Sequence, residues 1–401
     1  MCKLSLRSDS TLIGACTPSS PWKLALFYFL VSSIAKGQWI EDPAVDARVQ
    51  QGIEYIYNIE FDKADKEFAE VVRLKPEHPA GYFFQAMTQW WRILSNFDDE
   101  SQDKPYFDML ETVIKMCEKR LDENENDVTA LFFKGGAVGF RGRLKANRGS
   151  WLGAANDGLV ALPAVRKAHA LEPDNYDVLL GIGIYNYYAD VIPNQYPIVK
   201  PFMLFLPRGD KKEGLEQLEL ASQKARYAKA EATYFLLQAY MQHEKNYIRA
   251  LEIARELNRK YPRNPLFHRM YGRCYVSMGY WGEAFQIFSE VEKRFRNKQV
   301  GYDVYDGREA YYYIGRHLFL AGRLDEALQN LYKCDELSRV IDKDGASGFM
   351  SMANLTIGLI YDLQKKRGSA LAQYQKVLMM KEYENTHKEA RRYMERSYTR
   401  N

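Results

Sequence analysis

A repeat of 34 residues constrains this chain more than any other feature of its sequence. The landmarks Tyr271-Gly272-x-x-Tyr275, Ala284 and Phe288 follow Leu237, Ala250 and Pro262 at one repeat length. Self-similarity at this period is typical of stacked helix–turn–helix units. Because such units mainly contact their neighbours, the chain can grow by adding units to an existing stack. The length of 401 residues therefore indicates a number of repeats.

Five units carry landmarks in a common order: a glycine or leucine, an alanine, a large apolar residue and, in two units, a closing proline. They are Gly52, Tyr55, Ala64, Phe68 and Pro76; Leu237, Ala250, Leu257 and Pro262; Gly272, Tyr275, Ala284 and Phe288; Gly315, Ala327 and Leu331; and Gly358, Tyr361, Ala370 and Tyr374. The pattern resembles the tetratricopeptide (TPR) repeat. With three degenerate pairs after the first unit, the resemblance implies an all-α, right-handed TPR-like α-solenoid of about eight helix pairs.

The first 37 residues are predicted to be a secretory leader. An apolar run from Leu24 to Ala35 follows Lys23, and small residues follow the run at the spacing that a signal peptidase accepts. The run is shorter than the roughly 20 residues of a transmembrane helix. An uncleaved anchor and a buried helix are the alternatives. We expect an exported protein, in the periplasm or cell envelope if it is bacterial, whose solenoid covers residues 38–401.

Charge and motif content point away from several classes of function. The formal charge is +4, and the leader, with four basic residues and one acidic residue, accounts for +3 of it, which leaves about +1. This balance gives no general attraction to nucleic acid, so we expect no nucleic-acid partner. The cysteines outside the leader have no CxxC spacing, and the histidines have no metal-binding spacing. We expect no metal, no cofactor and no catalytic residue.

Two segments, 141–158 and 186–214, interrupt the period, and we interpret both as loop insertions. The second carries Pro193, Pro197, Pro201 and Pro207, which oppose a continuous helix. Insertions in repeat proteins often form the binding face. We expect the first to fold over the groove, and the second to be an ordered plug or an interaction arm. The predicted insertion surface comprises Arg148, Trp151, Asp157, Tyr187, Tyr188, Phe202 and Phe205, with Trp151 pinning the first loop and Asp157 capping the next helix or pairing with Arg148.

Tyr176 to Tyr240 carries a second resemblance, in the order GIYNYY…P…LPRGDKKEGLEQL. It resembles a family of exported bacterial TPR proteins and, more faintly, the eukaryotic TPR family linked to the mitochondrial outer membrane and inclusion-body clearance. Where the eukaryotic family has a Gly-Asp-Arg-like turn, this chain has Gly209, Asp210 and Lys211. Neither resemblance implies a catalytic residue. The charged residues 381–401 are predicted to form a C-terminal capping helix, because terminal repeats need a polar outer face.

The candidate groove is lined by the first helix of each unit. Offsets from Gly272 and Gly315 place Arg269 and Arg273 one helical turn apart, with Tyr312 and Arg316 beside them. Guanidinium groups in this arrangement can hold a carboxylate in a fork, with Tyr312 stacking. The alternative is that each arginine pairs with an acidic neighbour of its own chain, such as Glu309 or Glu283.

These observations predict a non-catalytic scaffold of the cell envelope. It would bind a peptide or protein segment, acidic or carboxylate-bearing, in the concave groove. Two alternatives stay open. One is a peripheral membrane protein that uses residues 198–206, and the other is an enzyme whose site at the two insertions joins Asp157, His169 and Asp190.

Overall fold

The computed structural model describes residues 40–195, 200, 207–342 and 345–400. The predicted leader lies outside these residues. So do Phe202 and Phe205, together with most of the segment 198–206 that a membrane role would use. The regular structure of the described residues is helical throughout, with no strand among them.

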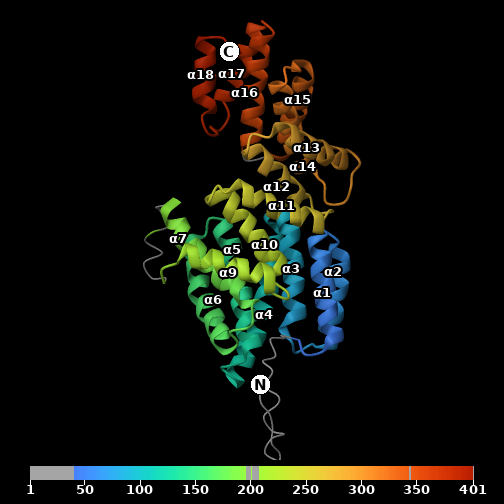
Figure 1. The fold of residues 1–401 in the computed structure, drawn as a ribbon, viewed down its shortest axis with the longest axis vertical. Coiled ribbons are helices and arrows are strands. Elements are labelled where there is room, and N and C mark those ends of the chain that lie inside the picture. Colours follow the sequence, from blue (N-terminus) through green and yellow to red (C-terminus); the bar gives the residue numbers. More distant parts are fainter. Residues whose placement is uncertain (1–39, 196–199, 201–206, 343–344, 401) are drawn as a thin grey trace, which may run out of the picture. The chain divides into compact units, whose positions relative to one another are not determined.

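Successive helices pack as eight antiparallel pairs followed by one last helix (Figure 1). The pairs are α1 (Pro43–Tyr57) with α2 (Phe61–Leu74), α3 (Pro79–Ser95) with α4 (Asp103–Glu123), α5 (Val128–Asn147) with α6 (Trp151–Leu171), α7 (Val178–Gln195) with α9 (Lys211–Lys224), α10 (Lys229–Gln238) with α11 (Tyr247–Lys260), α12 (Pro265–Ser277) with α13 (Trp281–Arg296), α14 (Val304–Leu320) with α15 (Leu324–Ile341), and α16 (Gly348–Leu363) with α17 (Arg367–Leu378). The last helix, α18, covers Thr386–Glu395. The predicted TPR-like solenoid of about eight helix pairs is confirmed.

The glycine landmarks mark the places where paired helices cross. A Cβ atom added at Gly272 would lie 2.7 Å from the ring of Phe288, and one added at Gly358 would lie 2.4 Å from the ring of Tyr374. Both distances are too short for a real contact, so only glycine lets the aromatic ring approach the helix backbone. The same relation joins Gly52 to Phe68 and Gly315 to Leu331.

The turn inside most helix pairs contains one residue in the left-handed backbone region. Glycine adopts this region without strain, whereas a β-branched residue rarely does. Six pairs have this turn, with Ile59, Gly149, Lys245, Gly279, Gly322 and Lys365 at the left-handed position. Ile59 is the β-branched member, and its side chain is buried.

The segment 141–158 lengthens its unit as helix, and the predicted loop over the groove is wrong. It forms the end of α5 and the start of α6, which are joined by a short turn at Gly149. Asp157 of α6 is buried and joins the two helices, because it accepts a hydrogen bond from Arg141 and pairs with Lys145, both on α5. Trp151 begins α6 with 42% of its surface exposed, so it does not pin a loop.

The described ends of the segment 186–214 are also helical. Asn186 to Gln195 continue α7, so Pro193 lies inside that helix, near the last of its described residues. Asp210 caps α9 by accepting a hydrogen bond from the Glu213 main-chain nitrogen (2.9 Å), as its sequence context suggests. Residues 196–199 and 201–206 lie outside the described part, so the choice between plug and arm stays a prediction.

The first helix pair contacts residues far along the chain, an arrangement that the repeat pattern does not contain. Tyr57 donates a hydrogen bond to Glu231 (2.8 Å), and Asn264 donates one to the main-chain oxygen of Tyr57 (3.0 Å). These partners are 174 and 207 residues apart. We call this set of contacts the N-terminal closure. Its other members are Asp46 with Arg226 and Tyr227, Glu54 with Lys260 and Tyr261, and Glu60 with Arg263.

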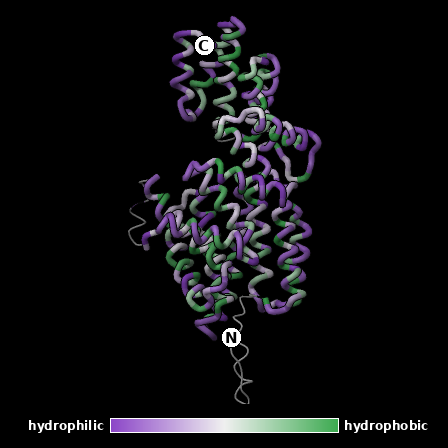
Figure 2. The backbone as a smooth tube through the Cα atoms, in the orientation of Figure 1, coloured by the Kyte–Doolittle hydropathy of each residue, from purple (hydrophilic) through white to green (hydrophobic). Residues whose placement is uncertain are grey.

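Aromatic side chains fill the space that the N-terminal closure encloses. The ring of Trp91 lies 5.0 Å from Tyr57, 5.7 Å from Tyr234 and 5.7 Å from Phe267, measured between ring centroids. Figure 1 accordingly shows α3 (blue) beside α10 (yellow-green). Figure 2 shows hydrophobic and hydrophilic residues alternating along the helices, as expected of helices that bury one side. Among the described helices, none combines the length and the apolar character that crossing a bilayer requires.

Candidate functional site

An open cleft of about 230 Å³ lies where the end of α3 meets the first helices of three later pairs. Its walls come from α3 and the turn after it, from α12, from α14 and from the start of α16. Three arginines face two carboxylates among the lining residues, and three aromatic rings accompany them. The lining residues are Leu94, Ser95, Phe97, Asp98, Arg269, Arg273, Tyr305, Arg308, Glu309 and Phe349.

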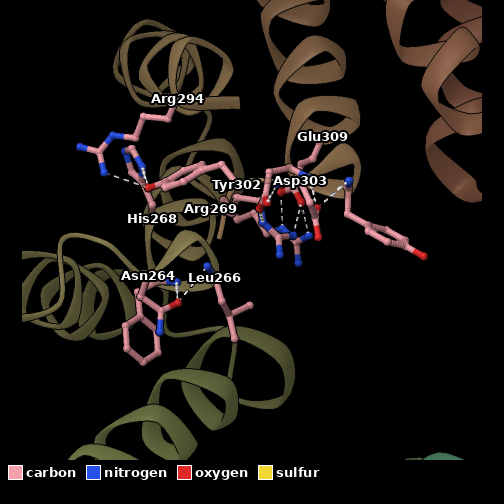
Figure 3. Close-up of polar contacts among 12 residues, drawn as sticks. Asn264, Leu266, His268, Arg269, Arg294, Tyr302, Asp303 and Glu309 are labelled. Atoms are coloured by element: carbon pink, nitrogen blue, oxygen red, sulfur yellow. Dashed lines mark hydrogen bonds and ion pairs between the residues drawn. The ribbon is translucent and has the colours of Figure 1, made fainter. Parts of the chain in front are cut away.

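Two arginines of the cleft share one buried carboxylate (Figure 3). Arg269 Nη1 donates to Glu309 Oε2 at 2.8 Å, while Arg273 donates through Nε and Nη2 to both oxygens of the same group. Glu309 is 1% exposed. Burial alone would raise the pKa of Glu309, but the two guanidinium groups outweigh it and hold the pKa at about 2. The sequence-based alternative, in which these arginines pair with Glu309, is therefore what the structure contains.

Arg308 is the third arginine of the cleft, and the offset from the glycine landmarks does not predict it. Its Nη1 donates to Asp342 Oδ1 at 2.8 Å, and its guanidinium carbon lies 5.2 Å from the ring centroid of Phe349 and 5.5 Å from that of Tyr305. Its Nε is buried without a hydrogen-bond partner among the described residues. The guanidinium group is therefore held in place by aromatic contacts and keeps unused donor capacity.

The opposite wall of the cleft is held by contacts across the chain. Arg148 places its guanidinium group 4.3 Å from the ring centroid of Phe97 and donates to the main-chain oxygen of Phe97 at 2.7 Å. Tyr305 donates to Asp98 Oδ2 at 2.9 Å, over a separation of 207 residues. The wall therefore depends on contacts that no local sequence pattern reveals.

The predicted groove residues are only partly brought together. Arg269 and Arg273 line the cleft, whereas Tyr312 and Arg316 do not. Tyr312 is buried, and its hydroxyl donates to Met352 Sδ at 3.4 Å. Arg316 donates to Thr356 Oγ1 at 3.3 Å. Both side chains thus contact α16, one or more turns beyond Tyr305 and Arg308.

The predicted insertion residues occupy separate places. Asp157 does not pair with Arg148 but accepts hydrogen bonds from Arg141 and forms an ion pair with Lys145 at 2.8 Å. Arg148 pairs instead with Asp103. The remaining described members are packing residues: the Tyr187 hydroxyl donates to Glu244 (2.9 Å), and Tyr188 packs on Phe235 and His243.

Asp157, His169 and Asp190, which the enzyme alternative would join, do not line the cleft. Asp157 is engaged by Arg141 and Lys145, while Asp190 accepts from the Lys211 main-chain nitrogen at 3.1 Å. His169 joins neither of them in a described pocket. Within the described ranges, no group of His, Cys, Asp or Glu side chains is arranged to hold a metal ion.

Next to the cleft, a buried histidine should make stability depend on pH. His268 Nδ1 lies 2.9 Å from the hydroxyl of Tyr302, which also accepts from Arg294 (2.9 Å; Figure 3). Burial, with the charge of Arg294, lowers the pKa of His268 to about 4 from its ordinary 6.5. Between these values the unfolded chain binds a proton that the folded chain does not, so stability falls as pH falls.

We expect the lowered pKa of His268 to reduce the free energy of unfolding by about 3 kcal/mol between pH 7 and pH 4. Each pKa unit corresponds to about 1.4 kcal/mol. Urea unfolding of the wild type and of His268→Gln, each at both pH values, measures the difference. The variant should lose less stability on acidification than the wild type. Equal losses for the two proteins would show that other groups carry the pH dependence.

Comparisons with known proteins give limited similarity. No model of a known protein family and no curated protein matches the chain. Among solved structures, the human IFIT1 dimer with m7Gppp-AAAA is similar with a TM-score of 0.43 and 14% identity, covering 90% of this chain and 89% of the other. The APC/C hetero-tetramer Cut9–Hcn1 is similar with a TM-score of 0.41 and 13% identity, covering 94% of this chain and 80% of the other. Neither similarity is high enough to transfer a ligand or a partner to this chain.

Proposed function

We propose that the chain is a non-catalytic interaction scaffold that binds a protein segment in the cleft through a carboxylate facing Arg273 and Arg308. The observation that carries the proposal is the lining itself, with three guanidinium groups against two carboxylates and three aromatic rings. Arginine held between aromatic rings is well suited to carboxylate recognition, because its planar donors are already oriented.

The size of the cleft favours a peptide side chain over a cofactor. Pockets for small molecules usually enclose about 300–1,000 Å³, whereas this cleft encloses about 230 Å³. One or two side chains of a segment lying across it would fill this volume. The aromatic walls from Phe97 and Phe349 suit an apolar residue next to the acidic one.

Donor groups remain for the bound carboxylate. Arg273 donates through Nε and Nη2 to Glu309, and Arg308 donates through Nη1 to Asp342 and Ser347. The other terminal nitrogen of each guanidinium has no partner among the described residues. A carboxylate placed between the two arginines could therefore accept a charge-assisted hydrogen bond from each of them.

The predicted leader supports a location for this scaffold outside the cytoplasm, in the periplasm or cell envelope if the protein is bacterial. Mass spectrometry of the protein purified from its native cell tests this part, because removal of residues 1–37 is expected. A membrane role would depend on residues 198–206.

The binding proposal is tested with a fluorescein-labelled peptide that contains glutamate, phenylalanine and norleucine. We expect Arg273→Met and Arg308→Met each to weaken binding at least about tenfold, because a hydrogen bond to a charged group contributes about 1.5–3 kcal/mol. Methionine keeps an apolar stem, and Glu309 retains Arg269 when Arg273 is changed. Fluorescence anisotropy with the full chain measures the affinity.

The matched control is Arg323→Met, which removes an exposed arginine that pairs with Glu326 away from the cleft. It should leave the affinity unchanged. If the wild type does not bind the peptide, or if both cleft variants bind as well as the control while keeping their melting temperature, the cleft is not the binding site.

A further inference from the structure

A small hollow opens beside the cleft and has the opposite electrostatic character. It encloses about 20 Å³ and shares Leu94, Ser95 and Arg269 with the cleft. Its own charged residues are Asp303 and Asp306, so two carboxylates face one guanidinium. A space of about 10–15 Å³ holds one water molecule, and an ammonium group is of similar size.

One carboxylate oxygen of the hollow lacks a hydrogen bond. Asp306 is 2% exposed, and its Oδ2 accepts from the Asp303 main-chain nitrogen at 2.8 Å. Its Oδ1 lies in ion-pair contact with Arg269 Nε, yet the geometry gives neither atom a hydrogen bond, and both are buried. Arg269 therefore supplies charge to this oxygen but no aligned donor, so Oδ1 is the atom of the carboxylate toward which a bound donor would be directed.

Burial raises the pKa of Asp306 to about 7, although the charge of Arg269 opposes the shift. The attraction of Arg269 therefore does not offset the effect of burial on the pKa of this carboxylate, because Arg269 also pairs with Glu309. A second positive charge would favour the ionised form.

The walls of the hollow distinguish between possible cations. Ile59, Trp91, Leu94, Pro265 and Leu266 surround the carboxylates with apolar surface. An aliphatic stem that ends in a compact ammonium group fits such a space, because the stem packs on apolar atoms while the head reaches the charge. The small space at the carboxylates favours this compact head over the wider, planar guanidinium group.

We propose that the segment bound in the cleft is bipolar, with an acidic side chain facing Arg273 and Arg308 and a neighbouring lysine whose ammonium group enters the hollow and donates to Asp306. This inference rests on the function proposed above. It names the chemistry of the partner, since a purely acidic segment would leave the hollow empty.

The test uses two labelled peptides that differ at one position. The first is the peptide with norleucine described above, and the second has lysine in place of norleucine, which adds the charge at nearly constant shape. At pH 8 we expect the lysine peptide to bind the full-length wild type at least about tenfold more tightly, the gain of a hydrogen bond between charged groups. Asp306→Asn should remove this advantage while the norleucine peptide keeps its affinity.

A second measurement needs no variant. At pH 5.5 the wild type carries a protonated Asp306, so the advantage of the lysine peptide should shrink severalfold relative to pH 8. The charged and titratable groups around Asp306 are Arg269 and His268 on α12, Arg294 on α13, Glu309 on α14, and Tyr302, Asp303 and Asp98 at the adjoining turns. With pKa values of about 4 and 2, His268 and Glu309 keep one charge state over this range.

The outcomes separate the two proposals. Equal affinity of the two peptides at pH 8 overturns the bipolar segment and leaves the scaffold standing, whereas failure of both peptides to bind overturns both proposals. An advantage of lysine that survives Asp306→Asn and does not change with pH overturns the hollow as its site. If Asp306→Asn does not fold, the pH comparison with the wild type decides alone.

Discussion

Replacing Glu309 by alanine is expected to lower the free energy of unfolding by about 3–5 kcal/mol, the usual cost of removing one partner of a buried ion pair. Glu309 is the acceptor for both Arg269 and Arg273, and all three side chains lie at the junction of α12 with α14. Without the carboxylate, two guanidinium groups stay close together with less compensating charge. Urea unfolding followed by circular dichroism measures the loss.

Two comparisons show whether the loss comes from charge. Glu326→Ala removes one partner of an exposed pair with Arg323 and should cost no more than about 1 kcal/mol. Adding Arg273→Met to Glu309→Ala should restore part of the lost stability, because it removes one uncompensated charge. If Glu309→Ala costs as little as Glu326→Ala, the buried cluster does not stabilise this junction.

The second large effect is expected at the N-terminal closure. Glu231 accepts from Tyr57 and from Arg143, whose guanidinium carbon lies 4.7 Å from the ring centroid of Trp90 and 4.3 Å from that of Phe235. Glu231→Ala leaves Arg143, whose side chain is only partly exposed, among these rings without its carboxylate. We expect a loss of about 3–5 kcal/mol.

The loss of stability in Glu231→Ala should be greatest in the first helix pair. Hydrogen exchange measured by mass spectrometry should become faster in α1 and α2, which the closure holds, before it changes in α16 and α17. Glu67→Ala, at a partly exposed ion pair with Arg48 within the same helix pair, is the matched control and should leave exchange in α1 nearly unchanged. Unchanged exchange in α1 of Glu231→Ala would contradict the role assigned to the closure.

The sequence predicts the parts of the fold that repeat at short range. Gly52 and Phe68, Gly272 and Phe288, Gly315 and Leu331, and Gly358 and Tyr374 meet inside single helix pairs, and each pair of residues has the same separation along the chain. A contact between residues of one unit must be encoded again in every unit, so the chain displays it as a period. For this reason the helix pairs could be counted before their packing was known.

Contacts between distant units leave no such trace. Asp46 with Arg226, or Tyr305 with Asp98, is a single pair of ordinary residues without any repetition. Each of these residues is of a common type for its position, and the sequence contains many other residues of opposite charge or suitable polarity with which it could pair. The N-terminal closure was therefore not predicted.

Only part of the candidate site was predicted, because its other residues are defined by contacts between distant units. Arg269 and Arg273 follow from the offset to Gly272, and applying that offset to Gly315 selected Tyr312 and Arg316. The cleft instead uses Tyr305 and Arg308, nearer the start of α14, because Phe97 and Asp98 complete its wall there. The offset locates the inner side of a helix, but the point along the helix depends on what lies opposite.

The N-terminal closure also sets an order of events during synthesis. Asp46 finds Arg226 only after 180 further residues have been added, and Tyr57 finds Asn264 after 207. At about 5–20 residues per second, a ribosome needs about 10–40 s to make this stretch. Throughout that time Tyr57, which ends up buried, lacks its partners Glu231 and Asn264. The helices made first are thus among the last to reach their native surroundings, and it is they that a chaperone would need to shield.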